Sequence, residues 1–368
     1  MRSPLLALLS LVVTLSLPLY GAPSAAAPLR LARLYSVTGG TIYLQRPTWS
    51  AFYSTYPRTM LTSDDLLNVP AGIEVVLLCP DGRLRNWLGA GVNNVGSVCP
   101  GTPRRYRPGF GISEQWGAAD PAEPYVISPR AGQVLTATPE LHWNAVAMAQ
   151  QYEVTLQRRE GDRWIDVWTV TSDRPSLCYP NGQPVLEPDR EYTFQVSVVG
   201  DPESTEELSE QPVFSLVGGE ERQAMEAVIA AIEALDIDSA TKTLILVEEV
   251  YPQHQLFARG MNELMSLIDA GYETAQVYRF LGDYAVRTGL ELPAEENYLK
   301  AIQLAQTAEN PEEEALAAWG LGTTHARVGS FESAQTYLQH AKQIATKISD
   351  DDLIARINAE LERFEPVR

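Results

Sequence analysis

The chain has 368 residues, of which 45% are hydrophobic and 20% are charged. This is the composition of a folded protein of two or three domains, and it excludes disorder over the whole chain. The formal net charge is −19: residues 29–216 hold 15 basic residues, all of them arginine, against 21 acidic ones, whereas residues 217–368 hold 12 against 26. So acidic a C-terminal part repels phosphate backbones and anionic lipid headgroups, which excludes nucleic acid as an expected partner.

The first 26 residues have the layout of a secretory signal peptide. Arg2 supplies a positive charge, Leu5–Leu19 is almost wholly apolar, and Ser24–Ala27 offers small residues for cleavage. The apolar run is shorter than the roughly 20 residues that a membrane-spanning helix needs. We therefore expect an exported protein of the periplasm or cell envelope, or a secreted one, without a membrane span after cleavage of residues 1–26. An uncleaved anchor is the alternative interpretation.

Residues 31–100 are expected to form a small all-β domain. Thr41–Leu44 alternates between outward and inward positions with a β-branched and aromatic bias. Ile73–Leu78 is a short apolar run between the turn sequences Pro70–Gly72 and Pro80–Gly82. Turn residues on both sides of such a run favour a strand over a helix.

The stretch Met60–Leu67, followed by Val75–Leu78 and then Asp81–Gly82, resembles the FecR-like β-domain of bacterial envelope proteins. That family commonly has a Leu-x-x-Gly-Asp pattern before its strand and an Asp-Gly turn after it. This chain departs from the pattern at Asp64, where glycine is expected. The resemblance implies a small β-domain and no catalytic residues to carry over.

Three cysteines remain after the signal peptide: Cys79, Cys99 and Cys178. Disulfides persist in exported proteins. Cys79 and Cys99 are close in sequence and each lies between an aliphatic residue and a proline, so we predict that they pair. Two buried free thiols, or another pairing of the three, remain alternatives. Cys178 is then expected to be a small buried hydrophobic residue.

Residues 101–124 are rich in proline, glycine and arginine and are expected to form a linker. The linker holds the densest basic cluster of the chain, Arg104–Arg107. The cluster is interpreted either as a contact for an anion or an acidic partner, or as a solvated segment that leans on the acidic C-terminal part.

Residues 125–216 are expected to form a β-sandwich. Tyr152–Leu156 alternates cleanly, Trp164–Val170 is rich in strand-forming residues, and alternation returns in Leu186–Val196. Trp143, the Leu-x-Pro sequence that starts at Leu186, and Tyr192 are together similar to the fibronectin type III pattern, within the broader immunoglobulin-like class. The resemblance implies that the hydroxyl of Tyr192 bonds to nearby backbone at a corner before its strand.

Residues 219–368 are expected to be helical, because proline becomes scarce and apolar residues recur three and four positions apart. Two segments repeat each other, and four of their paired positions lie 40 residues apart. The candidate helix-packing residues are Gly282, Ala285, Gly289, Ala294, Tyr298 and Ala301 in the first segment and Gly322, Ala326, Gly329, Ala334, Leu338 and Ala341 in the second.

Within each segment this spacing resembles the tetratricopeptide repeat (TPR), whose period is 34 residues. The six extra residues are assigned to an acidic insert around residues 307–312. Small residues let two antiparallel helices approach, and the bulkier Tyr298 or Leu338 fills the gap between hairpins. A degenerate repeat is expected over Ser239–Ala270, and a capping helix is expected to begin at Asp350–Asp352.

No sequence template for catalysis, metal binding or phosphate binding is matched, and no cofactor is expected. The four histidines lack a second histidine or cysteine at ligand spacing. His325 and His340 lie in the second repeat, where surface or inter-helix positions are the expected interpretation. The chain is therefore expected to be a multi-domain protein, two all-β modules followed by an all-α helical repeat array, and not an enzyme.

The predicted function is an exported, non-catalytic scaffold that binds a partner protein through the groove of the TPR-like array. Its alternative is a glycan-binding or surface-attachment protein that acts through the β-modules, an idea prompted by the seven tryptophans of the chain.

Overall fold

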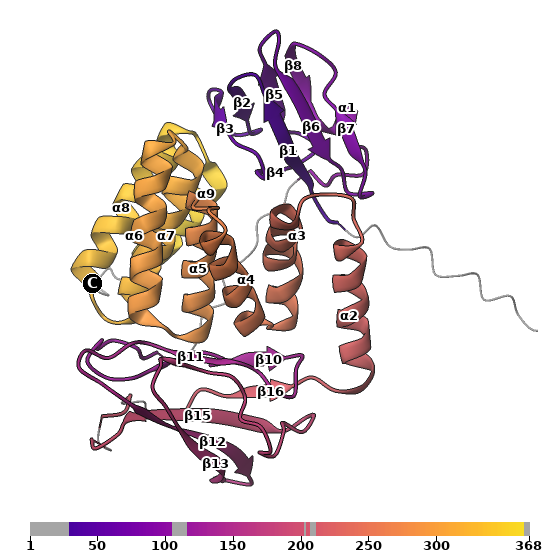
Figure 1. Ribbon diagram of the computed structural model, residues 1–368. Helices are drawn as coiled ribbons and strands as arrows, with labels where there is room; N and C mark the ends of the chain where they lie inside the picture. The colour runs from indigo at the N-terminus through magenta and orange to yellow at the C-terminus, as the bar shows by residue number, and fades with distance from the viewer. Residues whose placement is uncertain (1–28, 105–115, 202–203, 207–210, 364–368) are drawn as a thin grey trace, which may run out of the picture.

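The computed structural model describes residues 29–104, 116–201, 204–206 and 211–363. The predicted signal peptide, and residues 105–107 of the arginine cluster, lie outside these ranges. Within them, strands occupy the N-terminal part and helices α2–α9 the C-terminal part, as the sequence predicts (Figure 1).

The N-terminal β unit, residues 29–104, consists of two four-stranded sheets with the orders β4-β1-β6-β7 and β3-β2-β5-β8. Alternation places Ile42 and Leu44 in its core and turns Tyr43 outward. The elements of this unit are β1 (Ala32–Thr38), β2 (Ile42–Gln45), β3 (Tyr53–Thr55), β4 (Met60–Leu61), β5 (Leu66–Val69), β6 (Glu74–Leu78), β7 (Leu84–Asn86), β8 (Gly91–Asn94) and the short helix α1 (Val95–Val98).

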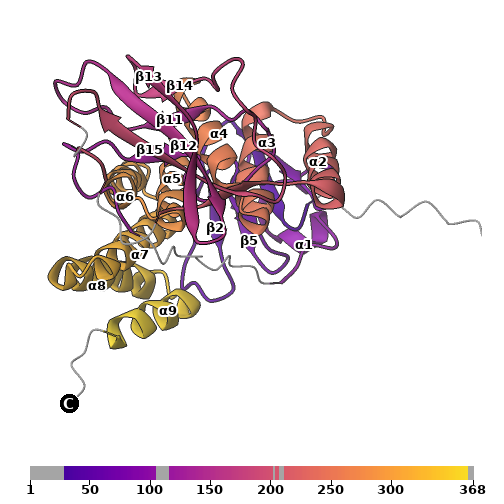
Figure 2. The same ribbon diagram turned by 90° about the horizontal axis from the view of Figure 1, so that it is seen from below.

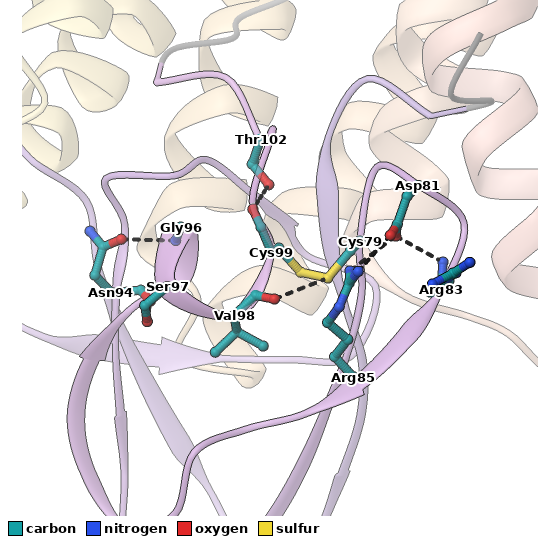
Figure 3. The surroundings of a disulfide bond; sticks show 10 residues. All are labelled: Cys79, Asp81, Arg83, Arg85, Asn94, Gly96, Ser97, Val98, Cys99 and Thr102. Carbon is teal, nitrogen blue, oxygen red and sulfur yellow. Dashed lines mark hydrogen bonds and ion pairs between the residues drawn. A yellow bond between two sulfur atoms is a disulfide. The ribbon is translucent and has the colours of Figure 1, made fainter. Parts of the chain in front are cut away.

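A disulfide joins the end of β6 to the end of α1 (Figure 3). Cys79 and Cys99 are both fully buried, and the backbone N–H of Cys99 donates to the carbonyl of Val95, 2.9 Å away. The predicted pairing is therefore confirmed. The prediction for Cys178 is wrong: this free thiol is exposed, because it follows the short edge strand β14 (Ser176–Leu177) instead of entering the core.

The second β unit is a sandwich of a five-stranded sheet, ordered β10-β16-β15-β12-β13, and a three-stranded sheet, ordered β14-β11-β9. The backbone N–H of Glu187 donates to the hydroxyl oxygen of Tyr192 at 2.8 Å, which is the corner contact expected for this tyrosine. Besides β14, its strands are β9 (Val126–Ser128), β10 (Gly132–Val134), β11 (Leu141–Trp143), β12 (Tyr152–Glu160), β13 (Arg163–Ser172), β15 (Glu191–Val198) and β16 (Phe214–Leu216).

The helical array is built from antiparallel hairpins of unequal regularity. The expected hairpin over Ser239–Ala270 is present, but its first arm changes from an α-helix to a π-helix and then to a 3-10 turn. The helices are α2 (Gly219–Glu233), α3 (Ser239–Ile245), the π-helix η1 (Leu246–Val250), the 3-10 helix η2 (Tyr251–His254), α4 (Phe257–Asp269), α5 (Ala275–Thr288), α6 (Glu291–Thr307), α7 (Pro311–Arg327), α8 (Phe331–Lys347) and α9 (Asp351–Glu362).

The acidic insert expected around residues 307–312 is absent as a separate loop. α6 runs to Thr307, and α7 begins at Pro311 after an Asn310 cap whose side chain accepts from the N–H of Glu313. A proline at the first helical position and a capping asparagine before it favour helix from this point. The extra residues are therefore accommodated in α6, α7 and α8, each of which has 17 residues.

The helices stand between the two β units, which lie at opposite edges of the array (Figures 1 and 2). At one edge the N-terminal β unit meets the loop that precedes α7 and the end of α8: the hydroxyl of Ser54 donates to the carbonyl of Glu309, and that of Tyr53 to the carbonyl of Lys347, both at 2.9 Å. Ile348, which directly follows α8, is fully buried in the core of the N-terminal β unit. The core of the N-terminal β unit therefore includes a residue of the helical array, so the two predicted domains share a core here.

At the other edge the sandwich meets the turns inside the hairpins. The N–H of Gln133 donates to the carbonyl of Gln255 at 2.8 Å, and that of Gly117 to the carbonyl of Gly289 at 2.9 Å. Gly117 also accepts from the N–H of Glu291. The end of the segment expected to be a linker is therefore held against the turn between α5 and α6.

Removing the disulfide should lower the stability of the protein. The bond joins residues that are 20 positions apart in sequence. A cross-link of this length lowers the conformational entropy of the unfolded chain and so stabilises the folded state by roughly 3 kcal/mol. We expect the variant with Cys79→Ser and Cys99→Ser to lose about this much free energy of unfolding, measured by denaturant titration. Cys178→Ser is the matched control and should leave the midpoint unchanged. Equal midpoints for the double variant and the parent would contradict a stabilising role.

Candidate functional site: the helical array and its interface with the N-terminal β unit

Two of the predicted repeat residues make the same contact in both repeats. A Cβ atom added to Gly282 would lie 2.7 Å from the ring of Tyr298, and one added to Gly322 would lie 2.7 Å from Cγ of Leu338. Gly320 of the next hairpin also packs on the ring of Tyr298. A larger residue at these glycines would force the two helices of a hairpin apart.

The other predicted packing residues divide into two groups. Gly289 and Gly329 have positive φ angles of 72° and 79° and lie at the turns that end α5 and α7. Gly329 is exposed and its predicted packing role is wrong; its role is conformational, because only glycine adopts this backbone region without strain. Ala326 is half-buried, whereas the alanines buried between helices are Ala285, Ala294, Ala301, Ala334 and Ala341.

α5 is the central helix of the array and has no exposed face. Eleven of its 14 residues are buried and none is exposed. The buried residues include the charged Arg279 and Asp283. A binding groove that runs over α5 is therefore not open in this structure.

Arg279 is surrounded by carboxylates. Its Nη1 lies 2.9 Å from Asp283, and its Nε lies 2.6 Å from Glu313 in the first turn of α7. Asp283 also accepts a hydrogen bond of 2.8 Å from the hydroxyl of Tyr298. Burial raises the pKa of Asp283 to about 6, and the charge of Arg279 opposes that shift.

Arg46 of the N-terminal β unit makes a matching set of contacts. Its Nε and Nη2 each lie 2.8 Å from the carboxylate of Glu312, and its Nη1 lies 2.8 Å from the fully buried Asp65. Glu312 and Glu313 are neighbours in the first turn of α7. The same helix end therefore pairs with two arginines, Arg46 of the β unit and Arg279 of α5. The two acids also complement the positive end of the helix dipole.

Arg33 on β1 provides a third contact between the N-terminal β unit and the array. Its Nη1 lies 2.8 Å from Glu248, and its Nη2 lies 2.7 Å from Glu249. Both glutamates belong to the π-helix η1 and both are buried. Burial raises the pKa of Glu248 to about 7, against the opposing charge of Arg33.

A cavity of about 50 Å³ lies in this interface, lined by Arg46, Trp49, Arg279, Glu312 and Glu313 among others. It has room for a few water molecules. Each of its arginines already faces two carboxylates, so neither guanidinium is left to bind a substrate anion. The arrangement joins two units of the fold.

The histidines lie outside this cavity. His340 is 3.1 Å from Glu314, and His325 stacks on Tyr337 with ring centroids 5.4 Å apart. In the described ranges no group of three or more histidine, cysteine, aspartate or glutamate side chains could hold a metal ion, and no helix there is long and apolar enough to cross a membrane. Five of the seven tryptophans are buried: Trp49, Trp87, Trp143, Trp168 and Trp319.

Sequence reasoning missed the arginine–carboxylate contacts. The partners in the Arg46–Glu312 pair are 266 residues apart, and no local pattern connects them. A global signal was present: residues 29–216 contain only arginine as their basic residue, whereas acidic residues are concentrated in residues 217–368.

Arg46→Lys should destabilise the protein although it keeps the charge. Lysine cannot donate in parallel to both oxygens of Glu312 and also reach Asp65, so we expect a loss of about 1–3 kcal/mol in free energy of unfolding. Arg85→Lys is the matched control, because Arg85 pairs with the half-exposed Asp81 within the β unit. Its change should stay below about 0.5 kcal/mol. Similar losses of unfolding free energy in the two variants would contradict a special role of Arg46.

The stability of the protein should decrease as the pH rises from 4.5 to about 7. The unfolded carboxyl of Glu248 titrates near 4.5 and the folded one near 7, so the folded state holds more protons in this window and loses relative stability as they leave. Glu248→Gln should flatten that slope in denaturant titrations at several pH values. Glu296→Gln, on the exposed side of α6, serves as control. A slope that Glu248→Gln leaves unchanged would show that another group titrates.

Comparison with known proteins adds no relative from which a role could be transferred: no protein-family model and no curated protein matches this chain. The functional assignment therefore rests on the residues and contacts described above.

Proposed function

We propose that this protein is an exported, non-catalytic scaffold that binds another protein through its helical array, in the manner of a TPR-type repeat protein. The observation that carries the proposal is the recurrence of one glycine–large residue contact, Gly282 with Tyr298 and Gly322 with Leu338. The contact closes each hairpin in the same way; hairpins of like packing stack into extended surfaces, and such surfaces bind segments of other proteins.

Two observations support the proposed compartment. A buried disulfide at Cys79–Cys99 suits an oxidising environment outside the cytosol. The apolar run of residues 5–19 and the small residues after it suit a cleaved signal peptide.

The two β units are proposed to hold the array in one geometry, as a FecR-like module and a fibronectin type III-like module. The Tyr192 corner supports the second assignment. Because the β units hold opposite edges of the array, the hairpins cannot change curvature freely. A scaffold that is rigid before binding loses less conformational entropy when it binds.

The partner surface is proposed to lie toward the C-terminal end of the array, because most of α5 is buried and none of its residues is fully exposed. α7 exposes Arg327 in its last turn, and α9 exposes Asp352 and Ala355 on its outer side. The alternative, glycan binding through the β units, loses its motivation because most of the tryptophans are core residues.

The proposal is tested by site-specific photo-crosslinking of the intact mature chain in native envelope extract. A photoreactive phenylalanine derivative replaces Arg327, Ala355 or, as control on the sandwich, Thr169, all of which are exposed. We expect one protein to be crosslinked from Arg327 or Ala355 and not from Thr169. Products only from Thr169 would transfer the binding function to the β units. Isolated halves are unsuitable baits, because Ile348 completes the core of the N-terminal β unit.

A further inference from the structure

An open pocket of about 340 Å³ lies between α4 and the sandwich. Figure 1 shows α4 directly above β10 and β11, and the side of α4 that faces them forms one wall. This volume is at the small end of the range for pockets that bind small molecules or single side chains. The pocket is separate from the arginine–carboxylate interface, which lies at the opposite edge of the array.

The two walls differ in chemistry. On α4, Ala258, Asn262 and Ser266 follow one another at four-residue intervals and therefore lie on one face of the helix. The sandwich wall combines the apolar Pro129, Val134, Leu135 and Pro139 with the polar Ser128, Gln133, Thr136 and Glu140. These two walls fit a ligand that has an apolar group between them and a polar group facing α4.

Two buried polar atoms of the lining have no hydrogen-bond partner. Ser128 is fully buried, and its Oγ is unpartnered; so is Oδ1 of Asn262 on the opposite wall. An unpartnered buried oxygen costs about 1–3 kcal/mol. Because Asn262 as a whole is half-buried, a turn of its amide would bring Oδ1 to a ligand donor and recover this cost. The amide oxygen of Asn262 can only accept, so the group that satisfies it must be an N–H or O–H donor.

The charges at the rim are mainly negative. Arg259 is engaged with Glu263 at 2.8 Å, and the same carboxylate oxygen accepts from the hydroxyl of Tyr251 at 2.7 Å. Glu140 lies on the other side of the pocket, 3.7 Å from Nε2 of His142, with about half of its side chain exposed. A ligand that carries a positive charge beside its apolar group complements this rim.

We propose that this pocket binds an extended peptide segment of the partner protein, with one apolar side chain between α4 and the sandwich and a basic residue beside it facing Glu140. The amide of Asn262 turns toward the pocket, and a backbone N–H of the peptide donates to its Oδ1. The inference rests on the proposed scaffold function and names a second contact site for it. A peptide supplies all three features at adjacent positions, and its length crosses the open mouth of the pocket.

The test uses fluorescein-labelled octapeptides and the intact mature chain, with binding followed by fluorescence anisotropy. The central residue is leucine, phenylalanine or alanine, and its neighbours are lysine or glutamate. We expect the leucine or phenylalanine peptides with lysine neighbours to bind. Those with alanine or with glutamate neighbours should bind at least about tenfold more weakly, because apolar burial or charge complementarity is lost.

Variants of the pocket locate the binding. Asn262→Ala should weaken the best peptide by about tenfold through loss of the acceptor, whereas Asn297→Ala on α6, whose side chain bonds only within its own helix, should not. Ser266→Trp places a large ring at the exposed mouth and should abolish binding. Circular dichroism and thermal unfolding of each variant check that the fold is retained. If Asn262→Ala unfolds, peptide binding to Ser266→Trp still tests the inference.

Several outcomes would overturn the inference. These are no binding by any peptide, undiminished binding to Ser266→Trp, or binding of the blocked single residue N-acetyl-leucinamide as tight as that of the octapeptides, which would make the pocket a small-molecule site. If the crosslinking from α7 or α9 still captures a protein while the peptides fail, the scaffold proposal stands and the pocket inference falls. If the peptides bind while the crosslinking captures nothing, the pocket inference stands and the partner surface proposed on α7 and α9 falls.

Discussion

The arrangement of this protein depends on arginines of the N-terminal β unit that meet carboxylates of the helical array. Arg33 meets Glu248 and Glu249 in η1, Arg46 meets Glu312 at the start of α7, and Arg58 lies 3.2 Å from Asp238, the residue that caps α3. Buried charges are unfavourable unless they are paired and hydrogen-bonded. A change in the relative position of the two units would leave several charges without partners. The contacts therefore specify one arrangement more than they add net stability.

This constraint gives a physical reason for the unequal use of basic residues. A guanidinium can donate to both oxygens of one carboxylate and still reach another, whereas an ammonium acts as a point charge. Arg46 uses its geometry in this way with Glu312 and Asp65, and the guanidinium of Arg58 also stacks 4.9 Å from the ring centroid of Tyr272. Part of the acidity of the helical array is therefore directed at the protein's own β unit.

The sequence was informative where the signal is local. Alternation predicted strands such as β2 and β12, matched Cys-Pro contexts predicted the disulfide, and the 40-residue recurrence predicted the helix pairs of α5–α6 and α7–α8. What it could not supply were contacts between residues hundreds of positions apart, such as Arg46 with Glu312. The π-helix η1, whose Glu248 and Glu249 pair with Arg33, was also missed, because no local pattern marks a π-helix in the sequence.

The position of Ile348 in the core of the N-terminal β unit has a consequence for biogenesis. A ribosome makes the β unit first, and most of the array must be synthesised before the residue that completes that core becomes available. Contacts of such wide sequence separation close late and make folding slow. The nascent β unit is therefore left with an unfilled apolar site and unpaired arginines for as long as the rest of the chain is missing, a state that favours holding by chaperones over early folding.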